Sequence, residues 1–205
     1  MKLKITLPES FADVSVRKYI TMIDAWDSYP KAADKVKAAV SVLCNMKMEH
    51  LDMMSVASYE QVAKGLMWMM DSPRDGTKGK PHKFVTIDGI KYGFIPDWTK
   101  LTLAEFADLE SYATGGFFEN LNCVLAIVYR PVTEEVVQLY EIEPYEPSPE
   151  RKAAMNDCPM DVAVEAMVFF YNIAETLLSN SEYFLKKVEQ KAKTNRKGAY
   201  QKAKV

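Results

Sequence analysis

KFVTIDGIKYGFI, residues 83–95, places Asp88-Gly89 between two short segments rich in β-branched and aromatic residues. An Asp-Gly pair in that setting is the strongest short-range signal for a two-residue β-hairpin turn. Pro96 then ends the second segment, because proline has no N–H to donate to a sheet ladder. We therefore expect an antiparallel hairpin over about residues 83–95.

Helical signals follow the hairpin. Thr102 and Glu105 have the spacing of a capping box, which predicts a helix over 103–112. After a Gly-Gly break, residues 117–128 are almost entirely apolar, so we expect a central helix that stops at Tyr129-Arg130-Pro131. Residues 136–142 fit either a strand or an extended connection.

Before the hairpin, the chain alternates charged and apolar side chains and then takes a helical period. Residues 2–7 indicate a short strand, which could join the hairpin. Helices are expected from Asp13 or Ser15 to about Trp26, over 31–46, and over 59–70 with Ser58 as the cap. Residues 71–80 form the clearest loop, because they combine Pro, Gly, Asp and basic residues.

After the central helix, Ser148-Pro149-Glu150 is a good helix start, and Asp157–Asp161 opens a long helix. The expected fold class is therefore α+β, mostly helical with a small antiparallel sheet. We expect one globular domain over 1–181, followed by a basic C-terminal helix or tail over 182–205.

Composition is that of a globular protein. The 205 residues are 48% hydrophobic and 26% charged, and the chain is long enough to bury a sizeable core. No window approaches the roughly 20 apolar residues that span a bilayer, and the start of the chain lacks a secretory signal pattern. The three cysteines are widely spaced, so we expect reduced thiols in the cytosol.

Charge is concentrated at the C-terminal end. Residues 182–205 hold eight basic and two acidic residues (+6), so the overall charge of −2 leaves −8 on residues 1–181. One interpretation is contact with nucleic acid or an acidic surface, and the other is a solvated helix whose lysines suit its own dipole. The candidate contact residues are Lys186, Lys187, Lys191, Lys193, Arg196 and Lys197.

Residue patterns that carry catalysis are missing. His50 and His82 are the only histidines, and neither has a Cys or His at the spacing of a zinc site. Gly115-Gly116 lacks the Lys-Ser/Thr that follows in a phosphate loop. We expect no catalytic residues, no cofactor and no metal, and hence no enzymatic activity.

Methionine is abundant between residues 46 and 70, where seven of the twelve methionines lie. Flexible thioether side chains fill irregular cores, and they also suit adaptable interfaces. The candidate interface residues are Met67, Trp68, Met70 and Arg130. For Arg130 we also expect a structural role, with its guanidinium on the last carbonyls of the central helix or on a nearby carboxylate.

A family resemblance rests on three segments: residues 87–110 (IDGIKYGFIPDWTKLTLAEFADLE), 120–132 (NLNCVLAIVYRPV) and 140–170 (YEIEPYEPSPERKAAMNDCPMDVAVEAMVFF). Together with the short N-terminal strand they resemble small virion-associated and assembly proteins of tailed bacteriophages, crAss-like phages among them. The likeness covers roughly residues 1–180 and leaves the basic tail outside.

The resemblance implies a non-enzymatic structural or cargo protein of the virion, present in many copies and made in the host cytoplasm. Its partners would be other phage structural proteins, with DNA or an acidic surface for the basic tail and no membrane. The alternative is a tail assembly chaperone that does not remain in the particle.

Overall fold

A computed structural model describes residues 5–70, 80–115, 119–137 and 139–170. The chain divides into two compact units, Met1–Ala166 and Met167–Val205. The domain boundary expected at residue 181 lies outside the described residues, as do the loop over 71–79 and the basic tail, so these stay predictions.

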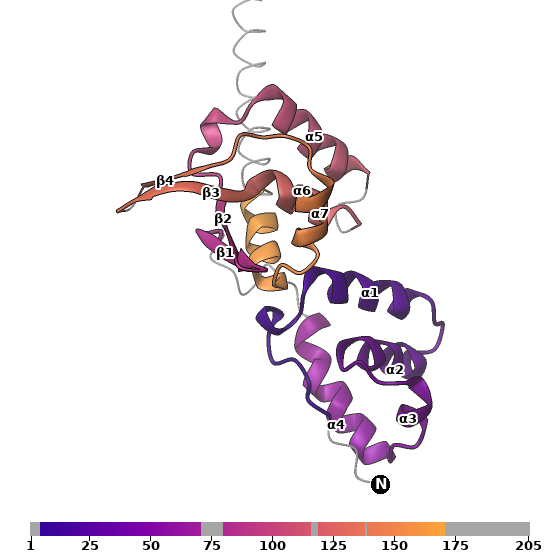
Figure 1. Ribbon diagram of the computed structural model, residues 1–205. Helices are drawn as coiled ribbons and strands as arrows, with labels where there is room; N and C mark the ends of the chain where they lie inside the picture. The colour runs from indigo at the N-terminus through magenta and orange to yellow at the C-terminus, as the bar shows by residue number, and fades with distance from the viewer. Residues whose placement is uncertain (1–4, 71–79, 116–118, 138, 171–205) are drawn as a thin grey trace, which may run out of the picture. The chain divides into compact units, whose positions relative to one another are not determined.

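Short helices make up the first part of the larger unit (Figure 1). Ser15 caps the first of them, with its Oγ 3.3 Å from the backbone N of Lys18. The core of this part is aliphatic and includes Val16, Met22 and Leu43. The elements are η1 (Phe11–Asp13), α1 (Val16–Asp27), α2 (Ala32–Leu43), α3 (Met48–Asp52), α4 (Val56–Leu66) and η2 (Met67–Met70).

The second part of the same unit is built on a four-stranded antiparallel sheet in the order β1-β2-β3-β4. Its strands are β1 (Phe84–Ile87), β2 (Ile90–Phe94), β3 (Tyr129–Val136) and β4 (Leu139–Ile142). The expected hairpin is confirmed: Ile87 pairs with Ile90, and Asp88 and Gly89 have φ values of 50° and 78°. Both are in the left-handed region that a type I′ turn requires.

Several short helices belong to the same part of the unit as the sheet (Figure 1). They are η4 (Trp98–Lys100), α5 (Leu103–Thr114), α6 (Leu121–Val128), α7 (Pro149–Met155) and helical residues 160–166. α6 is the expected central helix: all its residues except Asn122 and Cys123 are buried, and it packs against α5, α7 and β3. It passes directly into β3 at Tyr129, which is fully buried.

A short antiparallel bridge connects these two parts of the unit. Ser15 pairs with Pro159, the N–H of Val16 donates to the carbonyl of Cys158 at 2.9 Å, and that of Met160 donates to Val14 at 2.8 Å. The starts of α1 and of the helix at 160–166 are therefore held by the same backbone contacts.

Four expectations need correction. Residues 5–7 form no strand and Leu7 instead lies against Gly65 of α4, whereas residues 2–4 lie outside the described residues. α4 begins three residues earlier than expected, because Ser55 and not Ser58 accepts the capping hydrogen bond. The central helix begins at Leu121, and residues 136–142 belong to a hairpin of β3 and β4 rather than to one strand.

Candidate functional site

A buried ion pair organises the residues around the start of β3. Nη2 of Arg130 lies 2.9 Å from Oε1 of Glu105, and the two side chains are 8% and 5% exposed. Glu105 is also the capping-box residue of α5, with Oε2 accepting from the backbone N and Oγ1 of Thr102 at 2.6 and 2.7 Å. One carboxylate therefore joins the cap of α5 to β3.

Burial lowers the pKa of the Arg130 guanidinium, and the neighbouring Glu105 carboxylate opposes this effect. Of the two partners expected for Arg130, the structure has the nearby carboxylate. Its Nε is buried and has no hydrogen-bond partner among the described residues.

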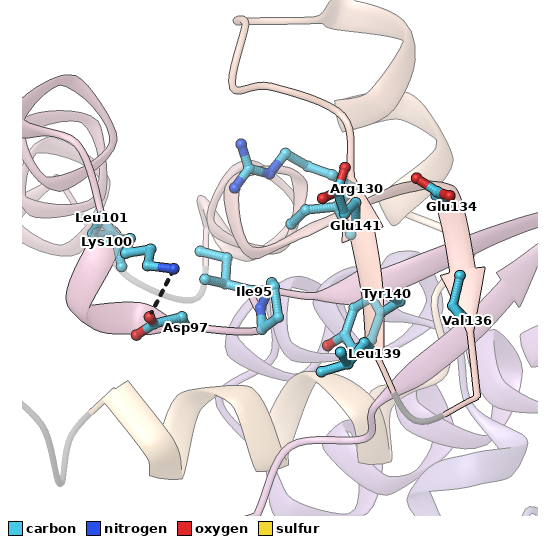
Figure 2. A pocket seen from close by; sticks show the side chains of 12 residues that line it. Ile95, Asp97, Lys100, Leu101, Arg130, Glu134, Val136, Leu139, Tyr140 and Glu141 are labelled. Atoms are coloured by element: carbon cyan, nitrogen blue, oxygen red, sulfur yellow. Dashed lines mark ion pairs between the residues drawn. The ribbon is translucent and has the colours of Figure 1, made fainter.

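Arg130 lines an open groove with a volume of about 680 Å³. One wall comes from the segment after β2 and includes Asp97, Lys100 and Leu101. The other wall is the β3–β4 hairpin (Figure 2). No local sequence signal predicts this groove, because its walls are about 35 residues apart in the chain and meet only through the order of the strands in the sheet.

Four side chains of the hairpin share one side of its pleat, and all four line the groove: Glu134, Val136, Leu139 and Glu141. We call them the hairpin face. Glu134 stands directly opposite Glu141 in the register, and Val136 stands opposite Leu139. The hairpin face therefore combines two carboxylates with two aliphatic side chains.

Neither carboxylate of the hairpin face forms an ion pair with a described residue. Acidic residues adjacent to them in sequence are paired: Glu135 with Lys91, and Glu143 with Arg151 at 3.0 Å. Across the groove, Asp97 is 3.4 Å from Lys100, and hydrogen bonds from Thr99 lower the pKa of Asp97. Glu134 and Glu141 thus lack the ion pairs that Asp97, Glu135 and Glu143 form.

Three described residues near the tip of this hairpin are apolar and exposed, and one of them has a strained backbone. Val136, Val137 and Leu139 are 56%, 92% and 79% exposed, and Val137 has a φ of 56°. Valine rarely adopts this left-handed conformation, because its branched Cβ collides with the backbone there. The β1–β2 hairpin meets the same demand with Asp88 and Gly89.

The base of the hairpin is held against β2. The hydroxyl of Tyr140 donates to the carbonyl of Phe94, and its ring covers Gly93. A Cβ at position 93 would lie 2.6 Å from Cε2 of Tyr140, so this contact requires glycine. The tip therefore projects from a packed base.

A second exposed apolar group lies on η4 and α5. Trp98, Leu103 and Phe106 are all exposed, and Leu103 and Phe106 are three residues apart on one helix face.

The interface candidates from the sequence have different environments. Met67 is exposed on η2, whereas the ring of Trp68 packs edge-on against Phe11 at 5.0 Å and its Nε1 is buried without a hydrogen-bond partner in the described residues. The side chain of Met70 and all six basic candidates of the tail lie outside the described residues. Their roles stay predictions.

Near Met67 is a small apolar pocket of about 130 Å³, lined by α1, α2, α4 and η2 side chains that include Met22, Trp26 and Met69. Met69 is buried and Met53 is exposed, so the methionine-rich window contributes both to the core and to the surface.

Reactive side chains are dispersed over the described residues. No group of three or more His, Cys, Asp and Glu residues there could hold a metal ion. The cysteines are free; Cys158 is fully buried, and burial raises its pKa to about 12. Nor does any described helix combine the length and apolar character needed to cross a membrane.

Comparisons with protein-family models, with curated proteins and with solved structures found no match to this chain.

Proposed function

We propose that this chain is a non-enzymatic structural or cargo protein of a tailed-phage virion, and that it acts through contacts with other proteins. The observation that supports this proposal best is the β3–β4 hairpin, whose exposed tip carries Val136, Val137 and Leu139. Hairpin turns usually hold polar, conformationally permissive residues, whereas Val137 in this one is apolar and β-branched.

Burial of the exposed tip residues by a partner is energetically favourable. Full burial of a Val or Leu side chain is favourable by about 1.5–3 kcal/mol, so a partner that covers three of them gains substantially. The base of the hairpin is packed by Tyr140 on Gly93, so little order is lost when the tip is bound. Such a preorganised apolar projection suits a component that is held in an assembly.

The test is quantitative mass spectrometry of purified phage particles from an infection. We expect the protein in the particles in many copies, at a constant ratio to the major capsid protein after repeated gradient purification. Presence in the lysate together with absence from the particles would contradict the proposal, and would favour a tail assembly chaperone that is not retained.

A further inference from the structure

The two carboxylates of the opposed pair Glu134–Glu141 repel each other in the isolated chain. Directly opposite residues of an antiparallel pair have Cβ atoms about 4.5–5.5 Å apart, and like charges there are destabilising. The register places these two carboxylates opposite each other, and neither forms an ion pair with a described residue. A cation supplied from outside would relieve this repulsion.

The groove beside this pair also has apolar surface. Val136 and Leu139 lie on the same hairpin face, and Leu101 lies on the other wall. A lysine side chain matches both features, since its alkyl stem covers apolar surface while its ammonium group reaches a carboxylate.

The edge of the sheet favours an extended ligand. β4 is the last strand of the sheet, so one row of its backbone groups faces no strand among the described residues. Arg130 forms part of the groove lining, but its side chain is only 8% exposed and is held by Glu105, so the hairpin face is the part of the groove that a ligand reaches.

The chain itself contains a segment of matching chemistry. Residues 182–205 carry a charge of +6 and hold lysines at close spacing, whereas residues 1–181 carry −8. Nucleic acid is disfavoured as the ligand of the groove, because phosphates would meet Glu134 and Glu141.

We propose that the groove beside the hairpin face binds the lysine-rich segment 182–205 of a second copy of this chain. The contact is heterologous, since the groove of one copy meets the tail of the next, and it therefore produces rings or open filaments. This inference deepens the proposed function, because it names the partner that makes a many-copy assembly.

The experiment uses full-length chains and sedimentation velocity over a range of concentrations. The groove-reversed chain carries Glu134→Lys and Glu141→Lys. The tail-neutral chain carries glutamine at the six candidate tail positions, Lys186, Lys187, Lys191, Lys193, Arg196 and Lys197. The matched control carries Glu49→Lys and Glu60→Lys, the same charge change at two exposed positions outside the groove.

We expect the wild-type chain and the control to self-associate, and to dissociate in about 1 M salt, where the Debye length is about 3 Å. The groove-reversed and tail-neutral chains should each be monomeric. Mixed together they should form a 1:1 dimer and nothing larger, since only one groove and one tail remain functional.

A conservative variant separates binding from folding. Glu134→Gln with Glu141→Gln removes the repulsion without changing side-chain size. We expect self-association to weaken about tenfold or more, as it does when charged contacts at an interface are lost. The melting temperature should equal or exceed that of the wild type, because the repulsion between the two carboxylates is gone.

Several results would overturn the inference: a wild-type chain that stays monomeric, a groove-reversed chain that associates like the wild type, or a mixture that forms no dimer. A tail-neutral chain that loses binding to a DNA duplex but still self-associates would assign the tail to nucleic acid instead. None of these results changes whether the protein is found in particles, so the proposed function is tested separately.

Discussion

Arg130 and Glu105 form a buried ion pair, 2.9 Å from Nη2 to Oε1, that joins the first residues of β3 to the first turn of α5. The pair places the two walls of the groove with respect to each other, because α5 follows the η4 wall directly and β3 forms half of the hairpin wall. Loss of either charge leaves the other charge buried without a partner.

For this pair we expect Arg130→Met to lower the free energy of unfolding by about 3–5 kcal/mol, because it strands the Glu105 carboxylate. Glu105→Gln in the same chain should restore most of that loss, since glutamine is neutral and still completes a capping box. Urea denaturation measures both. A loss below about 1 kcal/mol for Arg130→Met would show that the pair does not hold the fold together.

At the strained tip of the hairpin we expect a substitution to stabilise the protein. Val137→Asn should raise the free energy of unfolding by about 1 kcal/mol, because asparagine tolerates a φ of 56° far better than valine does. Val56→Asn, at another exposed valine, is the matched control and should not stabilise the protein. Destabilisation by Val137→Asn would mean that valine is tolerated there without strain.

Asp13 gives a pH-dependent expectation. Its Oδ2 accepts hydrogen bonds from the backbone N–H groups of Glu9 and Ser10, each 3.0 Å away, and these bonds lower its pKa below the ordinary 3.8. A group whose pKa is lower in the folded state stabilises the fold above its unfolded pKa, and this contribution disappears as the pH falls through the folded value.

Asp13→Asn should therefore lower the melting temperature at pH 7. The difference from the wild type should shrink as the pH falls below 3.8. Thermal melts followed by circular dichroism across this range measure the effect. A difference that stays constant with pH would show that the charge of Asp13 is not involved.

The reactivity of the Cys158 thiol tests the packing of the segment that follows α7. Cys158 is fully buried with a pKa raised to about 12, so its thiolate is scarce at pH 8. We expect iodoacetamide to leave Cys158 unmodified in the native protein and to modify it in urea, as mapped by mass spectrometry. The half-buried Cys123 is the internal control. Rapid native labelling of Cys158 would contradict the packing described.

Local signals in the sequence were enough to predict several elements. Asp88-Gly89 predicted the turn of the first hairpin, Thr102 and Glu105 predicted the cap of α5, and Ser148-Pro149 predicted the start of α7. Each of these signals acts through backbone hydrogen bonds or dihedral angles within four residues. Such elements do not depend on distant contacts.

The groove could not be predicted in the same way. The β3–β4 turn has Val137 where a turn residue would be expected, and no break separates α6 from β3. The pairing of β2 with β3, which brings the η4 segment to the hairpin, depends on contacts across more than 30 residues. Ser55 and Ser58 are equally good caps by type, so residue type alone could not tell which of them caps α4.

The central claim, that this chain acts by presenting the hairpin to other virion proteins, is tested most directly by measuring its copy number in purified particles when the tip is changed. The test variant carries Val136→Ser and Leu139→Ser, and the matched control carries Met53→Ser and Val56→Ser at similarly exposed positions in the helical part. We expect the control to be incorporated like the wild type and the tip variant to be strongly depleted from particles while it stays folded in the lysate. Equal incorporation of both variants would contradict the claim.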